Sequence, residues 1–404
     1  MKATAALVST TAVQVTTAFA ALTIPSLIAV VQGQPGFHAI SPGTFISILY
    51  AGAAVATIVA GTAVESLGAM RTSQLAVLSC AVGLMMATEG SEVSLIAAAL
   101  ALGLGYGPIT PASSQLLNAA TSARNRRFVF SLKQTGVPAG TALAGALVPV
   151  MTVGLGWKPA LFVVVAICAS VVVGVHPLTS RLVTSPKARV VSRPKWWRAI
   201  GVALAHPYLR VLSLAAFVLG GAQMCASAFL ASYFFGQVGF TPLRAGAMVT
   251  VANVCGAGFR LVWGAVADRG ANPRLLLAGL SLAACLAEVV LASPGLMASF
   301  PVAAVTCAVL GSVIIGWNGV LLSEIADAVP ASQVASATAG CLFFSFGGVM
   351  AFPAAFGVIQ RLSGSFVVPW SMVAGANALL GVLLLSGMRN PIANSEAKAS
   401  AVDE

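Results

Sequence analysis

Charged residues are scarce in this chain of 404 residues. Asp, Glu, Lys and Arg together make up 8% of it, hydrophobic residues make up 58%, and the mean hydropathy is +0.96. So little polar surface cannot coat a water-soluble globule, and the composition therefore indicates an integral membrane protein. The net charge of +11 lies in short segments between apolar runs. This placement favours lipid head groups, and excludes nucleic acid, as the partner of the basic residues.

The chain also lacks the residue spacings of most catalytic and metal sites. Its seven cysteines occur singly inside apolar segments, without CxxC spacing or a Cys/His cluster, so we expect neither disulfides nor a metal site. No P-loop is present, which argues against an ATP-driven pump, and no GxSxG or buried acid pair suggests an enzyme. A receptor built on a transporter fold would usually carry a long tail or soluble domain. Only a short polar tail follows the last apolar run here, so a receptor is not expected. We expect no cofactor.

Long apolar runs are abundant instead. Twelve are long enough to cross about 30 Å of hydrocarbon, at roughly 20 residues each. They lie near 4–31, 43–64, 72–90, 94–119, 127–152, 158–180, 208–236, 243–267, 273–292, 298–324, 331–361 and 366–388. The AFA triplet at Ala18 to Ala20 could mark a cleaved signal peptide, but the apolar run continues to Val31 and suits a retained span better.

The lysines and arginines predict the orientation. With the N-terminus inside, the outer segments hold only Lys158, Arg244 and Arg361, and sixteen basic residues fall on the inner side. Both termini are therefore expected inside a plasma (bacterial inner) membrane. The predicted organisation is a six-helix bundle at 1–180, a cytoplasmic linker at 181–207, a second six-helix bundle at 208–390 and a short polar tail at 391–404. The RPKWWR segment of the linker suits either an interfacial helix or a solvated connector.

One short pattern occurs in both halves of the chain. Gly61 to Arg71 reads GTAVESLGAMR and Gly264 to Arg274 reads GAVADRGANPR, with glycine, acid and arginine at the first, fifth and eleventh positions. A weaker repeat relates VFSLKQTG at 129–136 to VASATAG at 334–340. Both repeats indicate an internal duplication.

The duplicated pattern, between spans two and three and between spans eight and nine, resembles the signature loop of the major facilitator superfamily, GxLaDRxGRR. Glu65 replaces the usual aspartate and Ser66 the usual arginine. The resemblance implies an all-α membrane protein of twelve helices in two bundles, which works by alternating access. It assigns a gate to residues that pair when the inner side is closed. These residues are Gly61, Glu65, Gly68, Arg71, Gly264, Asp268, Arg269 and Arg274.

Three charges fall at membrane depth, where burial costs at least a few kcal/mol. Arg260 shares a helical face with Asn253, Gly256 and Gly264, and this stripe is expected to face a central cavity. The alternatives are an arginine that snorkels to the inner surface or pairs with Asp268.

Lys133, with Gln134 beside it, lies at similar depth in span five, with the same snorkelling alternative. If both cations face the cavity, one comes from each half of the chain, and a small anion could bridge them. The third charge, Glu288, is expected to be a snorkelling or interfacial carboxylate near the outer end of span nine.

The arrangement is similar to the carboxylate-transporting branches of the superfamily, in which an arginine in span eight, followed four residues later by glycine, contacts the substrate. Oxalate-type exchangers carry their lysine in span eleven, whereas here it lies in span five, so a monocarboxylate fits better than a dicarboxylate. Further substrate-binding candidates are polar residues that could equally hold helices together. They are Gln14, Tyr106, Gln223 and Asn318.

Pro108 and Pro111 predict a kink in span four, and Gly316 to Gly319 predict a loosened span ten. Glu324 is expected at the inner gate.

Two functions compete. The first is proton-coupled uptake of a small organic anion by a monomer. The second is proton-antiporting export of drugs or metabolites. Exporters of this kind typically carry an arginine in span four, four residues before a glycine. Here Ala99 and Ala101 occupy those positions, before Gly103 and Gly105. Because alanine stands where the exporters have arginine, the sequence favours uptake over export.

Overall fold

The computed structural model describes the chain except for residues 1, 32–39, 41, 123–124, 182–196 and 387–404. Within this part the elements are helices and no strand occurs. Twelve helical segments of the described chain are long and apolar enough to cross a membrane, which confirms the predicted fold class. The predicted polar tail and most of the linker fall outside the described residues, and α9 (Arg198–Ala205) forms the end of that linker.

The helices of the first half follow the predicted spans closely. Their bounds are α1 Lys2–Val31, α2 Pro42–Leu67, α3 Ala69–Ala87, α4 Glu92–Tyr106, α5 Ile109–Ala120, α6 Arg126–Gln134, α7 Gly136–Leu155 and α8 Trp157–Arg181.

The second half repeats this arrangement. Its elements are α10 Pro207–Gly236, α11 Pro242–Asp268, α12 Pro273–Leu291, α13 Pro294–Met297, α14 Phe300–Ile314, α15 Asn318–Asp327, the 3-10 turn η2 Ala331–Gln333, α16 Val334–Ser363 and α17 Val367–Ser386. All seven cysteines are free.

Contacts group the chain into two compact units. Unit 1 comprises Met1–Ser122, Lys133–Val202 and Pro330–Phe343, and unit 2 comprises Ala123–Leu132, Ala203–Val329 and Phe344–Glu404. Each unit therefore contains one half of the chain together with a short helical piece of the other. The start of α16 belongs to unit 1 and the start of α6 belongs to unit 2.

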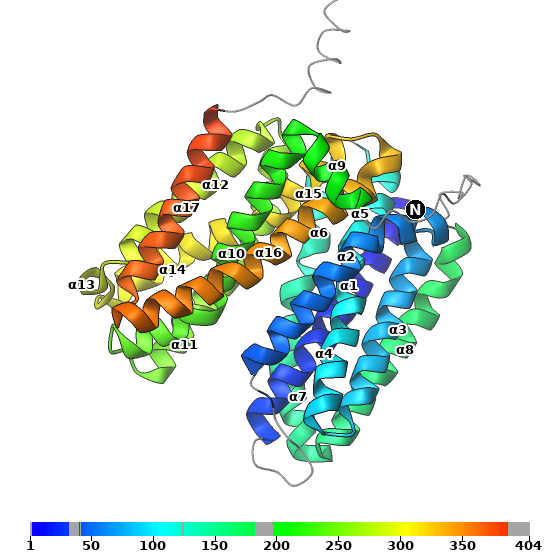
Figure 1. Ribbon diagram of the computed structural model, residues 1–404, viewed down its shortest axis with the longest axis horizontal. Helices are drawn as coiled ribbons and strands as arrows, with labels where there is room; N and C mark the ends of the chain where they lie inside the picture. Colours follow the sequence, from blue (N-terminus) through cyan, green and yellow to red (C-terminus); the bar gives the residue numbers. More distant parts are fainter. Residues whose placement is uncertain (1, 32–39, 41, 123–124, 182–196, 387–404) are drawn as a thin grey trace, which may run out of the picture. The chain divides into compact units, whose positions relative to one another are not determined.

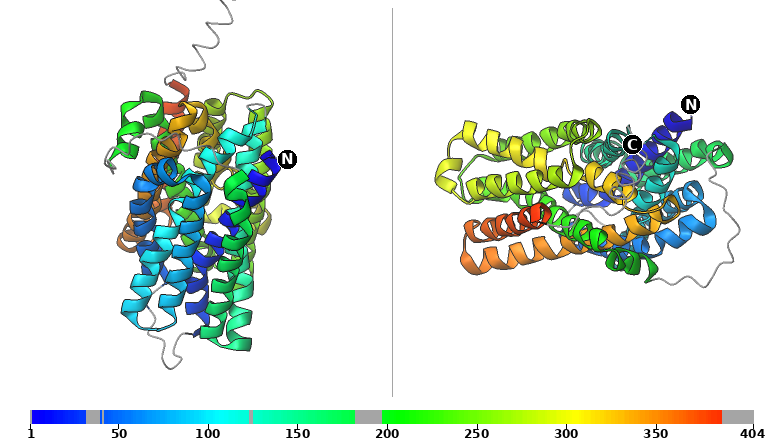
Figure 2. Two further views of the ribbon diagram at one scale, coloured as in Figure 1. Left: turned by 90° about the vertical axis from the view of Figure 1, so that its right-hand side faces the viewer. Right: turned by 90° about the horizontal axis from the view of Figure 1, so that it is seen from above.

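Unit 1 is built on close helix contacts at small residues. α1 packs on α7, and α4 packs on both α2 and α3, as the blue, cyan and teal helices show in Figures 1 and 2. A Cβ atom at Gly103 of α4 would lie 2.1 Å from the Leu49 carbonyl oxygen of α2, and one at Gly140 of α7 would lie 2.4 Å from that of Val15 in α1. Only glycine allows these backbones to approach so closely, as is typical of membrane helices.

Unit 2 follows the same principle. α12 packs on α17, and α11 packs on α14, in the green-to-red part of the chain in Figure 1. A Cβ atom at Gly311 of α14 would lie 1.9 Å from the Ala252 carbonyl oxygen of α11. The tight α11–α14 contact fixes the height at which α11 presents its polar side chains to α14.

Two spans are interrupted where the sequence predicts it. Span four breaks between α4 and α5 at Gly107 and Pro108, and span ten breaks between α14 and α15 at residues 315–317. Span five is interrupted at Thr135, between α6 and α7. Each interruption removes backbone hydrogen bonds that must be replaced within the protein, because lipid offers no partner.

The expectation for Glu288 is wrong. Its side chain is fully buried in unit 2, and the Asn377 amide of α17 donates to both carboxylate oxygens, at 3.0 and 2.9 Å. Ser281 Oγ lies 2.8 Å from the Asn377 backbone carbonyl oxygen and 3.2 Å from Oδ1. The carboxyl group is thus part of the α12–α17 contact, since a buried acid is tolerable only with hydrogen-bond donors.

Replacing Asn377 by Ala should destabilise unit 2 by about 1–3 kcal/mol or more, because the Glu288 carboxyl group would lose its donor while staying buried. Thermal unfolding of the purified protein in detergent measures this loss. Adding Glu288→Leu to Asn377→Leu should recover most of the stability, since a buried polar pair is often replaceable by apolar residues. Equal stability of the parent and Asn377→Ala would contradict the assigned contact.

Candidate functional site

Lys133 lies at the end of α6, just before the interruption of span five. Its side chain is 2% exposed, and Nζ donates to Gln14 Oε1 of α1 and, at 3.1 Å, to Gln134 Oε1. The position in the last turn of α6 places the ammonium group near the negative end of the helix dipole. Gly136 packs directly against the Gln14 side chain, so that the α1 and α7 backbones hold this amide in place.

Arg260 is the corresponding cation of unit 2. It is 2% exposed, and its Nε donates to the Ile315 carbonyl oxygen at 2.7 Å. Ile315 is the C-cap of α14, so the guanidinium group binds a carbonyl at the break of span ten. Burial rules out snorkelling to the surface. Asp268, the other expected partner, accepts instead from backbone amides of α6.

The glycines around Arg260 are packing positions. The sequence predicts that their shared stripe faces a central cavity. Within unit 2, however, a Cβ atom at Gly256 would lie 2.5 Å from Ile315 Cβ, and one at Gly264 would lie 2.5 Å from Ser131 Oγ of α6. These two glycines therefore bring α11 close to α14 and α6, and Arg260 is the polar residue of that packed face.

The other polar candidates occupy separate places. Gln223 of α10 accepts a hydrogen bond of 3.2 Å from Asn318 Nδ2, at the start of α15. The Tyr106 ring packs edge-on against Tyr50, at 6.1 Å between centroids. Asn253 is exposed, and its Nδ2 donates to Val249 O in its own helix at 2.9 Å.

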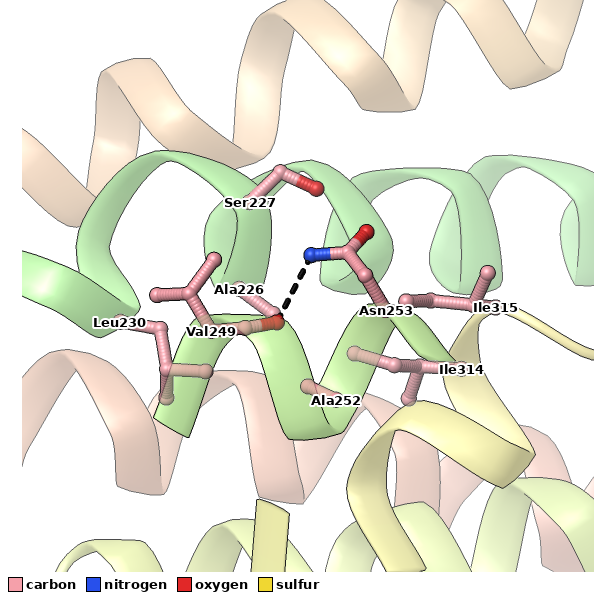
Figure 3. Close-up of a pocket in the computed structure, with 8 residues that line it drawn as sticks. All are labelled: Ala226, Ser227, Leu230, Val249, Ala252, Asn253, Ile314 and Ile315. Carbon is pink, nitrogen blue, oxygen red and sulfur yellow. Dashed lines mark hydrogen bonds between the residues drawn. The ribbon is translucent and has the colours of Figure 1, made fainter. Parts of the chain in front are cut away.

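Asn253 borders a small pocket of unit 2 that has room for about one water molecule. Figure 3 shows the Asn253 amide and the Ser227 hydroxyl beside it, above a mainly apolar wall. Its lining residues are Ala226, Ser227, Leu230, Val249, Ala252, Asn253, Ile314 and Ile315. The structure thus brings Gln14, Lys133 and Gln134 together in unit 1. In unit 2 it pairs Gln223 with Asn318, and Ile315 links Arg260 to the pocket.

The first signature copy contacts the start of α16 within unit 1. A Cβ atom at Gly61 would lie 2.5 Å from Ser336 Oγ, and that hydroxyl donates to Glu65 Oε1 at 3.2 Å. Arg198 of α9 forms a salt bridge of 2.8 Å with Glu65 Oε2. Gln115 of α5 also holds this end of α16, since its Oε1 accepts from the Ala335 amide at 3.1 Å.

The second signature copy makes the equivalent contact in unit 2. Gly264 lies against Ser131, and the Asp268 carboxylate accepts from the amides of Arg127 at 3.0 Å and Phe128 at 2.8 Å. These amides are in the first turn of α6, where a helix binds an anion through its unpaired N–H groups and its dipole. Asp268 therefore pairs with a helix start, where the sequence predicts a basic side chain.

The remaining signature residues shape the loops. Gly68 adopts φ +85° at the N-cap of α3, a conformation that only glycine adopts without strain. Arg71 follows in the first turn of α3 and is exposed. Arg269 is the C-cap of α11, and the Arg274 amide donates to Asn272 Oδ1 at 3.0 Å.

A charged network continues from α6 to α15 in unit 2. Arg126 pairs with Asp327, and Arg127 lies 3.3 Å from Asp327 Oδ2 and 3.9 Å from Glu324 Oε2. The Tyr208 hydroxyl of α10 donates to Glu324 Oε1 at 2.5 Å. Glu324, expected at the gate, thus lies near Arg127, whose backbone amide binds Asp268.

The sequence reasoning missed several partners. Ser131 and Ser336 occupy the third position of the weak repeat VFSLKQTG and VASATAG, so that alignment contained the signal for both serine–glycine contacts. Nothing in the sequence pattern points to the Ile315 carbonyl, because it is a backbone atom freed by the break in span ten.

Gly264→Ala should lower the free energy of unfolding by about 1–3 kcal/mol, because the new methyl group meets Ser131 and forces α11 away from α6. Gly258→Ala on the same helix is the matched control. A Cβ atom there meets nothing within 4 Å, so this variant should be neutral or slightly stabilising. Thermal unfolding in detergent compares the two. Equal effects would contradict a packing role for Gly264.

Comparisons with known proteins agree with this architecture. The E. coli fucose:proton symporter FucP gives a TM-score of 0.73 at 15% identity, covering 96% of this chain and 100% of that one. The human organic anion transporter MFSD10 gives 0.75 at 13% identity over 95% and 100%, and the proton:xylose symporter XylE gives 0.69 at 10% over 95% and 95%.

At these identities the likeness shows the fold alone. No curated protein sequence matches the chain. The family described as Major Facilitator Superfamily matches residues 7–353. The chain therefore belongs to the Major Facilitator Superfamily of membrane transporters.

Proposed function

We propose that this transporter carries a small organic anion, most simply a monocarboxylate, into the cell together with protons. The observation that carries the proposal is the burial of a cation in each unit, Lys133 and Arg260, both on helices that cross the membrane. The hydrogen-bond partners of Lys133 include the amide oxygen atoms of Gln14 and Gln134, and those of Arg260 include the Ile315 carbonyl oxygen. Amide and carbonyl dipoles orient a cation, and a substrate carboxylate would add a full negative charge.

The carboxylate is the chemical group that best suits these two residues. Arginine presents a planar fork of N–H donors that matches a carboxylate, and lysine supplies a compact second charge. Each unit supplies one such cation, and binding of the substrate anion would be coupled to the alternating-access motion of the family.

The two signature copies supply the gate of this mechanism. Glu65 holds the start of α16 through Ser336, and Asp268 holds the start of α6 through two amides. In the proposed cycle these contacts form on the inner side and break when the site opens inward. The serine–glycine contacts would separate at the same step.

The proteins of similar structure support parts of this proposal. FucP and XylE are named as proton symporters and MFSD10 as an organic anion transporter. Symport of an anion with protons would combine these two features. The competing function, export in exchange for protons, would appear in the same assay as efflux of substrate driven by the inward proton gradient.

Purified protein in proteoliposomes should take up at least one acid from a panel of labelled short-chain mono- and dicarboxylates, faster with an inward proton gradient. Arg260→Gln and Lys133→Gln should each lower uptake about 10-fold or more, the effect of losing a charged hydrogen bond of roughly 1.5–3 kcal/mol. The controls are Arg361→Gln and Lys158→Gln, exposed residues of the same types, which should transport like the parent. A parent that takes up no acid, or buried-cation variants that match their controls, would overturn the proposal.

A further inference from the structure

The break in span ten is closely packed against a side chain of α11. α14 ends at Ile314 and α15 begins at Asn318, with Gly316 in the interval. A Cβ atom at Gly316 would lie 2.3 Å from the Ser312 carbonyl oxygen and 2.6 Å from Cδ1 of Trp263 on α11. The indole ring therefore lies directly against the interrupted backbone.

Two side chains of α11 bind the carbonyl groups at this break. Trp263 Nε1 donates to the Ser312 carbonyl oxygen at 2.8 Å, and Arg260 Nε donates to that of Ile315 at 2.7 Å. In a continuous helix these two oxygens would accept from the amides four residues later, those of Gly316 and Gly319. Trp263 and Arg260 take the place of those amides, and they are three residues apart on one face of α11.

This arrangement fixes the plane of the guanidinium group. The five N–H donors of arginine are rigidly coplanar, so binding Nε to the Ile315 carbonyl determines where the terminal nitrogen atoms point. The terminal nitrogen atoms are then the pair that forms a fork with a carboxylate. The position of the Ile315 carbonyl, in turn, depends on how the turn from Ser312 to Gly316 is held.

We propose that Trp263 is a positioning residue for anion binding. It acts through the Ser312 carbonyl and the Gly316 turn on the Ile315 carbonyl, and through that atom on Arg260. This inference rests on the proposed function, because it assigns to Arg260 the carboxylate of the substrate. It adds a residue of α11 whose indole N–H binds the broken helix rather than the substrate.

The test compares two Trp→Phe variants in proteoliposomes, with whichever acid the parent transports. Trp263→Phe removes the N–H donor and keeps a ring against Gly316. Its KM should rise about five-fold, as expected for one lost neutral hydrogen bond, while Vmax stays close to that of the parent. The matched control is Trp370→Phe on α17, fully buried, whose Nε1 has no hydrogen-bond partner among the described residues. Its KM should not change.

A second variant separates positioning from folding. Trp263→His keeps a ring N–H and should give a KM between those of the parent and Trp263→Phe. An unchanged KM in Trp263→Phe, with uptake by the parent still dependent on Arg260, overturns this inference alone. A Trp263→Phe variant that loses Vmax and melting temperature together, without a rise in KM, shows a purely structural role and also overturns it. Parent uptake that does not depend on Arg260 refutes the proposed function, and this inference with it.

Discussion

The structure depends on one constraint, which is that charged groups and freed backbone groups in the hydrocarbon region must find their partners inside the protein. Breaks in helices and buried cations satisfy this constraint for each other. The break in span ten frees the Ile315 carbonyl, and Arg260 binds it. Lys133 lies at the end of α6, where the helix dipole is negative, and its ammonium group donates to Gln14. A cation and an interrupted helix would each be costly alone, and they are tolerable together.

The duplication preserves a contact as well as a sequence pattern. Gly61 packs on Ser336 and Gly264 packs on Ser131, with the same 2.5 Å distance from a Cβ atom to the serine hydroxyl. The acids that follow differ in reach. Glu65 extends to a serine side chain and to Arg198, whereas the shorter Asp268 binds backbone amides directly. The second contact is stricter geometrically, because amide positions are fixed by the helix and cannot follow a displaced carboxylate.

Much of the fold follows from the sequence, because the hydropathy of a segment shows whether it lies in lipid or in water. The twelve spans, and the interruptions at Pro108 and Gly316, are local properties and were predicted correctly. Side-chain partners are not local. Glu288 was expected at an interface from its place near a helix end, yet its donor Asn377 lies 89 residues away on α17. Which face of one helix meets which face of another decides such pairs, and one sequence does not contain that information.

The chemistry of the partners also bears on transport. A buried cation paired with a carboxylate of the protein costs several kcal/mol to separate, since both charges must lose their partner in a medium of low dielectric. Hydrogen bonds from a cation to amide or carbonyl oxygens are weaker, about 1.5–3 kcal/mol each. The bonds from Arg260 to the Ile315 carbonyl and from Lys133 to Gln134 are of this second kind. A substrate carboxylate forms a stronger contact than either of these bonds, and when it leaves, the same bonds keep each cation in place for the next cycle.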